Sequence, residues 1–180
     1  MELKNSAQTF GVVSRANHWL SAFLFIGLIA LGIYMHELPR SPEKFELYDL
    51  HKSLGIGLLM LMILRLVWLK VSPNPEQLSH NKFEHILAHS VKGILYLAML
   101  VMPISGWIMS NSGGHEVAFF DLFVLPTLVG ENDTVHEIAE GIHGTVGPLM
   151  IVVILLHVAG ALKHHFIYKD NTLKRMLGKK

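Results

Sequence analysis

The chain has 180 residues, 51% of them hydrophobic, and its 15 basic and 14 acidic residues give a formal net charge of +1. This charge balance indicates no nucleic-acid partner, and a mean hydropathy of +0.42 is too high for a typical soluble domain. The absence of cysteine excludes disulfides, iron–sulfur clusters and metal centres held by thiolates.

Four apolar stretches follow one another along the chain, at residues 19–35, 54–69, 93–109 and 146–162. Each is about 17 residues long, which is the lower limit for an α-helix that crosses a membrane. With their flanks, we expect spans at about 16–36, 51–70, 90–110 and 143–165 in one membrane domain, residues 1–180. A soluble four-helix bundle would need a charged face on every helix, and Arg65 is the one charged residue in these stretches. The predicted fold class is therefore all-α, an integral membrane four-helix bundle.

The first two predicted spans each begin beside a histidine, His18 in the first and His51 in the second. Residues 1–6 lack the basic segment and cleavage site of a signal peptide, so we expect the first span to be retained. Arg65 lies fourteen residues after His51. On a helix these two side chains share a face and lie near opposite membrane surfaces. We expect Arg65 to pair with an acidic group or to extend to the interface.

The segments around the third span contain prolines and one long loop. Residues 72–75 read Ser-Pro-Asn-Pro and end the second span. Pro103 lies within the third span and is expected to kink it. The following loop, residues 111–140, contains an apolar segment at 117–125 that is too short to cross a membrane. Two interpretations remain open for this segment: an interfacial or re-entrant piece that covers the end of the bundle, or a hydrophobic loop packed on the helix ends.

The fourth span carries two histidines, His143 near its start and His157 deep within it, and we expect Pro148 to mark its first turn. Fourteen residues of helix separate the histidines by about 21 Å and by about 40° of rotation. An imidazole is costly to bury in hydrocarbon without a partner. One helix face is therefore predicted to hold two cofactors, one near each membrane surface.

The distribution of basic residues predicts the orientation of the chain. With the N-terminus inside, twelve lysines and arginines lie on the cytoplasmic side and three lie outside, at Arg40, Lys44 and Lys52. Ten of the fourteen acidic residues lie on the outer side. By the positive-inside rule, both termini are expected in the cytoplasm.

Depth in the membrane pairs the histidines of different spans. His51 and His143 are expected to meet near the outer surface, and His18 is expected to meet His157 near the inner surface. His89, at the start of the third span, is the competing partner for His157. The remaining loop and helix-end histidines are expected to be solvated: His36, His80, His85, His115 and His136.

Imidazole pairs bind iron, copper or zinc, so the surroundings must identify the metal. The spans lack the carboxylates and thiolates that zinc and copper sites usually recruit, and they supply aromatic residues, methionines and glycines that suit a macrocycle. This environment favours haem. Its propionates are expected to meet Arg65, with Lys52 and Lys92 as weaker candidates.

Several short motifs resemble those of a known family. They are His18-Trp19-Leu20, residues 50–55 (Leu-His-Lys-Ser-Leu-Gly), residues 103–107 (Pro-Ile-Ser-Gly-Trp) and residues 164–176 (His-His-Phe-Ile-Tyr-Lys-Asp-Asn-Thr-Leu-Lys-Arg-Met). Together with the two histidines of the fourth span, they resemble the bacterial cytochrome b561 family over nearly the whole chain. The resemblance implies a bacterial inner-membrane protein with two b-type haems, ligated by His18, His51, His143 and His157. It also implies a quinone site at the cytoplasmic interface near His164. From the residues themselves, His164 and His165 are expected either to relay protons to the quinone or to contact lipid headgroups. Lys92 stands where some relatives hold a histidine, which argues against ligation by the third span.

Three functions are compatible with these observations. The favoured one is an electron-transfer cytochrome that connects the quinone pool with a cationic periplasmic redox protein. The alternatives are a superoxide oxidase that reduces ubiquinone, which leaves enzymatic activity open, and a membrane anchor subunit like the cytochrome b of nickel–iron hydrogenase. An anionic radical is best attracted by a cationic surface, whereas residues 111–140 contain six acids and no lysine or arginine.

Overall fold

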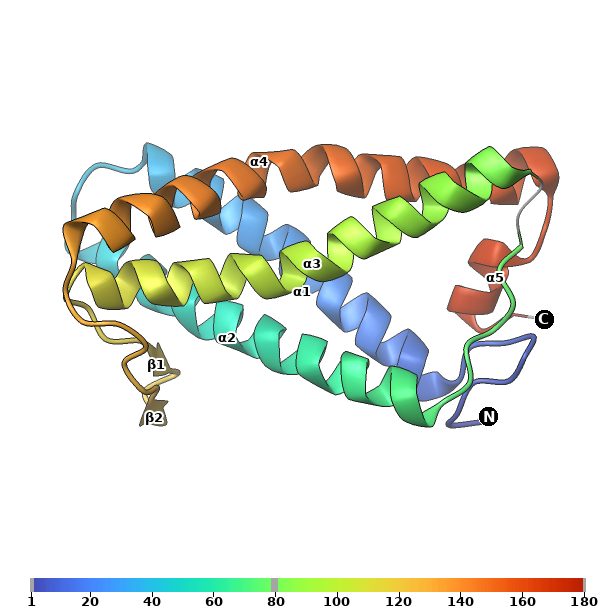
Figure 1. Ribbon diagram of the computed structural model, residues 1–180, viewed down its shortest axis with the longest axis horizontal. Coiled ribbons are helices and arrows are strands. Elements are labelled where there is room, and N and C mark those ends of the chain that lie inside the picture. Colours follow the sequence, from blue (N-terminus) through green and yellow to red (C-terminus); the bar gives the residue numbers. More distant parts are fainter. Residues whose placement is uncertain (1, 79–80, 180) are drawn as a thin grey trace.

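The computed structural model describes residues 2–78 and 81–179, so the predicted solvation of His80 lies outside the described residues. Its four long helices are α1 (Val12–Glu37), α2 (Pro42–Val71), α3 (Lys82–Ser112) and α4 (Asp133–Lys163). Each of these is long and apolar enough to cross a membrane. They run alternately up and down, so both termini lie at the same end of the bundle (Figure 1). The predicted all-α membrane bundle is confirmed.

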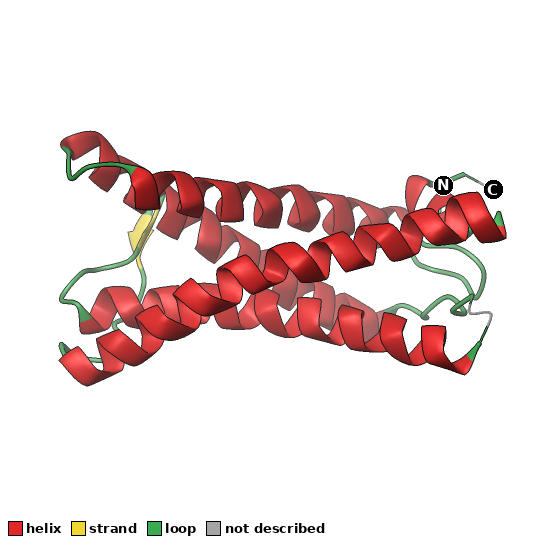
Figure 2. Ribbon diagram, turned by 90° about the horizontal axis from the view of Figure 1, so that it is seen from above, coloured by secondary structure: helices red, strands yellow, loops and turns green. Residues whose placement is uncertain are grey.

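We name the two ends of the bundle by what they carry. The terminal end holds both termini, and the opposite hairpin end holds a short β-hairpin in the α3–α4 connection (Figures 1 and 2). Within the bundle, α3 packs most extensively against α4, and α1 packs against α2.

The helices extend beyond the predicted spans because capping residues, rather than hydropathy, determine where they begin. The side chains of Ser41, Asn81 and Asn132 accept hydrogen bonds from the first turns of α2, α3 and α4. Helix α4 therefore starts at Asp133. Pro148 lies well inside it, and its predicted position in the first turn is wrong.

The buried core is a narrow strip of apolar side chains along the bundle axis. Its members are Phe25, Leu28, Leu58, Met62, Val91, Ala98, Met99, Met150 and Val153. Many large apolar residues face outward instead, including Phe23, Leu64 and Leu155, each more than 60% exposed. An apolar exterior over four helices fits a lipid environment.

The apolar segment in the α3–α4 connection is an antiparallel β-hairpin of β1 (Ala118–Phe119) and β2 (Phe123–Val124). Two of its three turn residues, Phe120 and Asp121, have positive φ values of 45° and 56°. The hydroxyl of Ser53 on α2 donates to the carbonyl of Ala118 and accepts from the amide of Phe120. The segment therefore packs against the side of α2 and not on the ends of the helices.

The C-terminal segment folds back under the terminal end of the bundle. After α4 the chain continues as a π-helix, η1 (His164–Tyr168), and a short helix, α5 (Thr172–Leu177). The indole of Trp19 donates to the carbonyl of Met176 at 3.0 Å. The guanidinium of Arg175 donates to the carbonyl of Glu76 at 2.8 Å. These bonds connect the last helix to α1 and to the segment after α2.

Candidate functional site

Two pairs of histidines face each other across the bundle. Near the terminal end, His18 of α1 lies opposite His157 of α4, with ring centres 6.2 Å apart. Near the hairpin end, His51 of α2 lies opposite His143 of α4, also at 6.2 Å. We refer to them as the terminal-end pair and the hairpin-end pair. Helix α4 contributes one histidine to each pair, so the fourteen-residue interval between His143 and His157 sets the separation of the pairs.

The spacing within each pair fits a metal ion between two imidazoles. A metal–imidazole bond is about 2 Å long, and a ring nitrogen lies roughly 1 Å from the ring centre, so two opposed rings have centres about 6 Å apart. The ring planes are inclined by 52° in the terminal-end pair and by 72° in the hairpin-end pair. Both observed distances match this arrangement.

The described residues contain no cluster of three or more histidine, cysteine, aspartate or glutamate side chains that could hold a metal ion. A zinc or copper site normally takes at least three such ligands. A haem iron already has four nitrogen ligands from the macrocycle and needs two axial ones. Two isolated histidine pairs therefore fit haem better than a bare metal ion.

The hairpin-end pair has neutral surroundings that hold His143 in place. Its Nδ1 lies 3.0 Å from the carbonyl oxygen of Met102 and 3.2 Å from the hydroxyl of Ser105. Donation of the Nδ1 proton to this carbonyl leaves Nε2 as the nitrogen for a metal. A Cβ on Gly106 would lie 3.1 Å from the His143 ring, so only glycine leaves the ring its full space. Nδ1 of His51 is buried without a hydrogen-bond partner.

The terminal-end pair lies beside positive charge. A terminal nitrogen of Arg65 is 3.5 Å from Nδ1 of His18. Nε of Arg65 donates to the hydroxyl of Tyr96 at 3.0 Å, and its guanidinium carbon lies 5.0 Å from the centre of that ring. Tyr96 thus holds the guanidinium next to His18. Lys92 of α3 donates a hydrogen bond to Gln77 at 2.9 Å.

The other predicted candidates lie elsewhere. Lys52 forms an ion pair with Asp49 at 2.6 Å and approaches the carbonyl of Glu116 at 3.4 Å. His89 is exposed, and its ring centre lies 4.5 Å from that of His85. It is therefore not placed opposite His157.

Most of the histidines that we expected to be solvated are exposed, namely His36, His85 and His115. His136 is only partly exposed, and its Nδ1 lies 2.9 Å from the carbonyl oxygen of Met109. Its predicted solvation is therefore incorrect, because the early start of α4 brings it against the end of α3.

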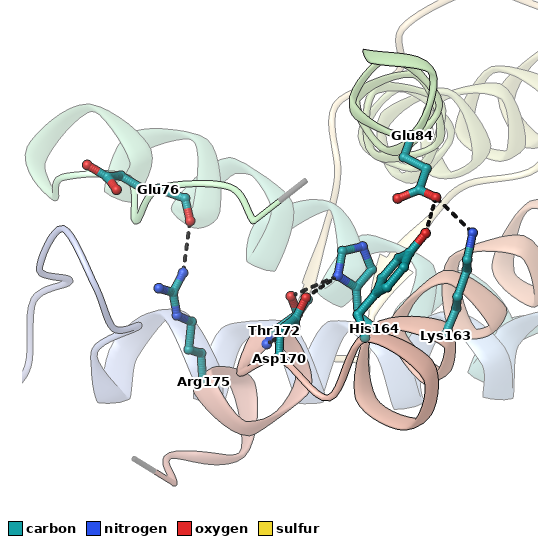
Figure 3. A network of polar contacts seen from close by, with 8 residues as sticks. Glu76, Glu84, Lys163, His164, Asp170, Thr172 and Arg175 are labelled. Carbon is teal, nitrogen blue, oxygen red and sulfur yellow. Dashed lines mark hydrogen bonds and ion pairs between the residues drawn. The ribbon is translucent and has the colours of Figure 1, made fainter. Parts of the chain in front are cut away.

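The two histidines predicted near a quinone lie in η1, at the terminal end. Nδ1 of His164 lies 2.6 Å from a carboxylate oxygen of Asp170 and 3.4 Å from the hydroxyl of Thr172 (Figure 3). Burial raises the pKa of Asp170, but hydrogen bonds from His164 and from Thr172 outweigh burial and bring that pKa to about 2. The carboxylate therefore stays ionised at neutral pH and fixes the orientation of the imidazole. Nδ1 of His165 is buried without a partner.

A second polar network connects α3 with the end of α4. One carboxylate oxygen of Glu84 accepts hydrogen bonds from Lys163 at 2.8 Å and from the hydroxyl of Tyr168 (Figure 3). Neither this network nor the role of Asp170 was predicted from the sequence. For Asp170 the sequence does offer a signal, since only a few residues separate it from His164 and His165. A chain reversal within this interval brings the Asp170 and His164 side chains together.

The hairpin end is strongly acidic at its surface. All ten acidic residues assigned to the outer side are exposed: Glu37, Glu43, Glu46, Asp49, Glu116, Asp121, Glu131, Asp133, Glu137 and Glu140. Among the basic residues there, Arg40 is exposed, whereas Lys44 and Lys52 are partly buried. This surface repels anions and attracts cationic molecules.

Comparison with known proteins identifies relatives of the whole chain. Residues 9–179 match the family model of prokaryotic cytochrome b561. The chain is 36% identical to cytochrome b561 homolog 2 of Escherichia coli K12, over 99% of this chain and 96% of that protein. It is 30% identical to the probable superoxide oxidase CybB of Yersinia pestis, over 91% and 92%. Identity to cytochrome b561 homolog 1 of Escherichia coli K12 is 28%, over 89% and 92%.

Proposed function

Because the chain belongs to the prokaryotic cytochrome b561 family, as its motifs predicted, we propose that it carries electrons across the membrane through two b-type haems. The proposed route connects the quinone pool with a periplasmic redox protein. Membership of the family makes the chain a membrane haem protein of electron transport. The number of haems, their ligands, the quinone and the partner are parts of the proposal.

The observation that carries the proposal is the equal spacing of the two histidine pairs at opposite ends of the bundle. We assign the terminal-end haem to His18 and His157, and the hairpin-end haem to His51 and His143. A haem with histidine on both faces supplies one-electron transfer and offers no open iron position to oxygen. The protein separates the sites by about 21 Å along α4, which divides the path across about 30 Å of hydrocarbon.

The test is the haem content of the purified protein. A pyridine haemochrome assay should give two b-type haems per chain, and a potentiometric titration of the spectrum should resolve two one-electron components. One haem per chain would contradict the assignment of two axial pairs.

For the orientation, we propose that the terminal end faces the cytoplasm, because twelve of the fifteen basic residues belong to that side. A reporter enzyme that is active only in the periplasm should be inactive when fused after residue 180. It should be active when fused within residues 126–131, in the loop at the hairpin end. The reverse pattern would overturn the proposed topology.

For the quinone, we propose a site next to His164, with His165 beside it. The ionised carboxylate of Asp170 holds the His164 imidazole at the terminal end. An imidazole can accept a proton at one nitrogen and donate one from the other, so it suits delivery of the protons that quinone reduction requires.

The quinone site can be tested with Asp170→Asn, which keeps the side-chain shape and removes its charge. We expect reoxidation of the reduced haems by a ubiquinone analogue to slow at least about tenfold, because the His164 imidazole loses the carboxylate that orients it. Both haems should remain. Glu76→Gln is the matched control, because Glu76 bonds Arg175 through its backbone oxygen (Figure 3). Equal rates in the two variants would contradict a role for Asp170.

For the periplasmic partner, we propose a cationic redox protein, because all ten acidic side chains of the hairpin end are exposed. Electrostatically guided association is fast at low ionic strength and slows as salt is added. Electron exchange with a basic soluble cytochrome c should therefore slow steeply between low and high salt. A rate that does not depend on ionic strength would exclude this kind of partner.

Superoxide oxidation is the second candidate, because a relative at 30% identity is a probable superoxide oxidase. The acidic surface of the hairpin end disfavours an anionic substrate, and Lys52 is paired with Asp49. Stopped-flow mixing of superoxide with the oxidised protein decides between the two. Haem reduction at near diffusion-limited rates would establish the oxidase, and slow reduction would exclude it.

A further inference from the structure

The β-hairpin covers a face of α2 that points away from the bundle. At about 100° per residue, Ser53 and Gly57 lie roughly 200° and 240° around the helix from His51. Leu58 and Met62, which belong to the core, lie within about 20° of His51 on the inner face. Ser53 is nevertheless only 5% exposed. The hairpin buries it from outside the bundle.

The covered face of α2 continues as the outer surface of the bundle. Leu64, about 220° around the helix from His51, lies almost in line with Gly57 and two turns further from the hairpin end. Its side chain is 61% exposed, and Val67 on the same side is 56% exposed. Since α2 is an apolar membrane-spanning helix, this surface faces lipid, and the hairpin lies at its border.

Along the helix axis, the hairpin contacts α2 at the start of its apolar stretch. Ser53 bonds β1, and a Cβ built on Gly57 would lie 3.8 Å from the ring of Phe119. Gly57 belongs to the apolar stretch 54–69. The hairpin accordingly projects sideways from α2 instead of extending beyond the ends of the helices (Figures 1 and 2).

The hairpin has one anchored side and one apolar exposed side. Val117, at its base, is 1% exposed. Leu122, Phe123 and Val124 are 75%, 48% and 55% exposed. The hairpin contains no basic residue, and its one acidic residue, Asp121, is in the turn. A patch of this kind is unfavourable in water.

We propose that the β-hairpin is an interfacial anchor whose exposed side chains enter the lipid leaflet at the hairpin end of the bundle. Two strands leave unpaired backbone groups on their outer edges, which hydrocarbon does not tolerate. The edges and the Asp121 carboxylate thus keep the hairpin at headgroup level. Leu122, Phe123 and Val124 contact the upper acyl chains. The occupant of this surface is lipid because the surface is continuous with the lipid-facing side of α2.

The natural absence of cysteine makes a direct test simple, since one introduced cysteine is the only thiol in the chain. The full-length haem-loaded protein carries Leu122→Cys with a nitroxide spin label, in phosphatidylethanolamine and phosphatidylglycerol vesicles. Power saturation then compares collisions with oxygen, which concentrates in lipid, and with a water-soluble nickel chelate. Leu64→Cys is the lipid reference. Glu137→Cys replaces an exposed residue of α4 and is the water reference.

We expect the label at position 122 to show a ratio of oxygen to nickel collisions well above that at position 137 and below that at the deeper position 64, with loss of most nickel collisions relative to position 137. A ratio like that of position 137 would place the hairpin in water and overturn the proposal. Protection from both reagents, with dipolar broadening between labels, would identify a second copy of the chain as the occupant and also overturn it. An unchanged haem spectrum shows that each labelled protein is folded.

Discussion

The two histidine pairs have the same 6.2 Å spacing, but they lie in different electrostatic surroundings. At the hairpin end, His143 bonds a backbone carbonyl and a hydroxyl, and Lys52, next to His51 in the sequence, is paired with Asp49. At the terminal end, a nitrogen of the Arg65 guanidinium lies 3.5 Å from Nδ1 of His18. The fold thus repeats the ligand geometry and changes the charge around it.

This difference bears on the direction of electron transfer. A haem gains a negative charge when it is reduced, so a nearby cation stabilises the reduced form and raises its potential. On our assignment, the terminal-end haem has the higher potential. Electrons then move favourably from the hairpin end towards the terminal end, where we place the quinone.

Loss of a ligand gives the largest expected effect and tests whether the two pairs are independent. His157→Ala should lose the terminal-end haem and keep the hairpin-end spectrum, whereas His143→Ala should do the opposite. Each variant should contain one haem per chain by pyridine haemochrome assay, because the opposite pair retains both imidazoles. Two haems in either variant would show that the pairing is incorrect.

Gly106→Ala should affect the hairpin-end haem alone. The new Cβ would lie 3.1 Å from the His143 ring, and such overpacking costs about 1–3 kcal/mol. We expect weaker retention of that haem during denaturant titration. Gly93→Ala on the same helix is the control, because its Cβ would meet nothing within 4 Å. If both variants release haem at the same denaturant concentration, contact with His143 is not the cause.

Arg65→Gln should reduce the difference in potential between the two haems. Removal of the guanidinium should lower the midpoint potential of the terminal-end haem by about 60 mV. For a one-electron couple this corresponds to a tenfold change in the equilibrium constant for reduction. Tyr96→Phe should give a smaller decrease, because the guanidinium stays but loses the hydroxyl that positions it. Lys52→Gln should leave both midpoints nearly unchanged. Equal shifts of both haems in the Arg65 variant would argue against a local charge effect.

Ser105→Ala should produce the smallest change. Its hydroxyl is 3.2 Å from Nδ1 of His143, but the Met102 carbonyl at 3.0 Å remains. The loss of one neutral hydrogen bond costs about 1 kcal/mol. We expect a small shift in the electron paramagnetic resonance signal of the hairpin-end haem and none in that of the other. Loss of this haem would mean that the hydroxyl, rather than the carbonyl, holds the ring.

Hydropathy and helical spacing were sufficient to predict the bundle and to bring the four histidines to two depths. The fourteen-residue interval between His143 and His157 is a local property of one helix, and the alternating direction of the spans follows from their order. The starts of the helices were missed because polar caps such as Asn132 contribute nothing to hydropathy.

Contacts between distant segments were harder to predict. The three-residue hairpin turn places Phe120 and Asp121 at positive φ, where glycine or asparagine is the usual signal in a sequence. The position of Arg65 depends on Tyr96 of α3, and such a contact depends on how the helices rotate against each other. The bond between Asp170 and His164 requires the π-helical turn, for which the sequence contains no strong signal.

Both histidine pairs include one residue of α4, the last of the four spans. During synthesis, neither pair can close until the ribosome has completed this helix and the membrane insertion machinery has released it next to α1 and α2. On our assignment of the axial ligands, insertion of haem is therefore a late step in biogenesis. On the same assignment, a truncated translation product that ends before α4 has no complete axial pair.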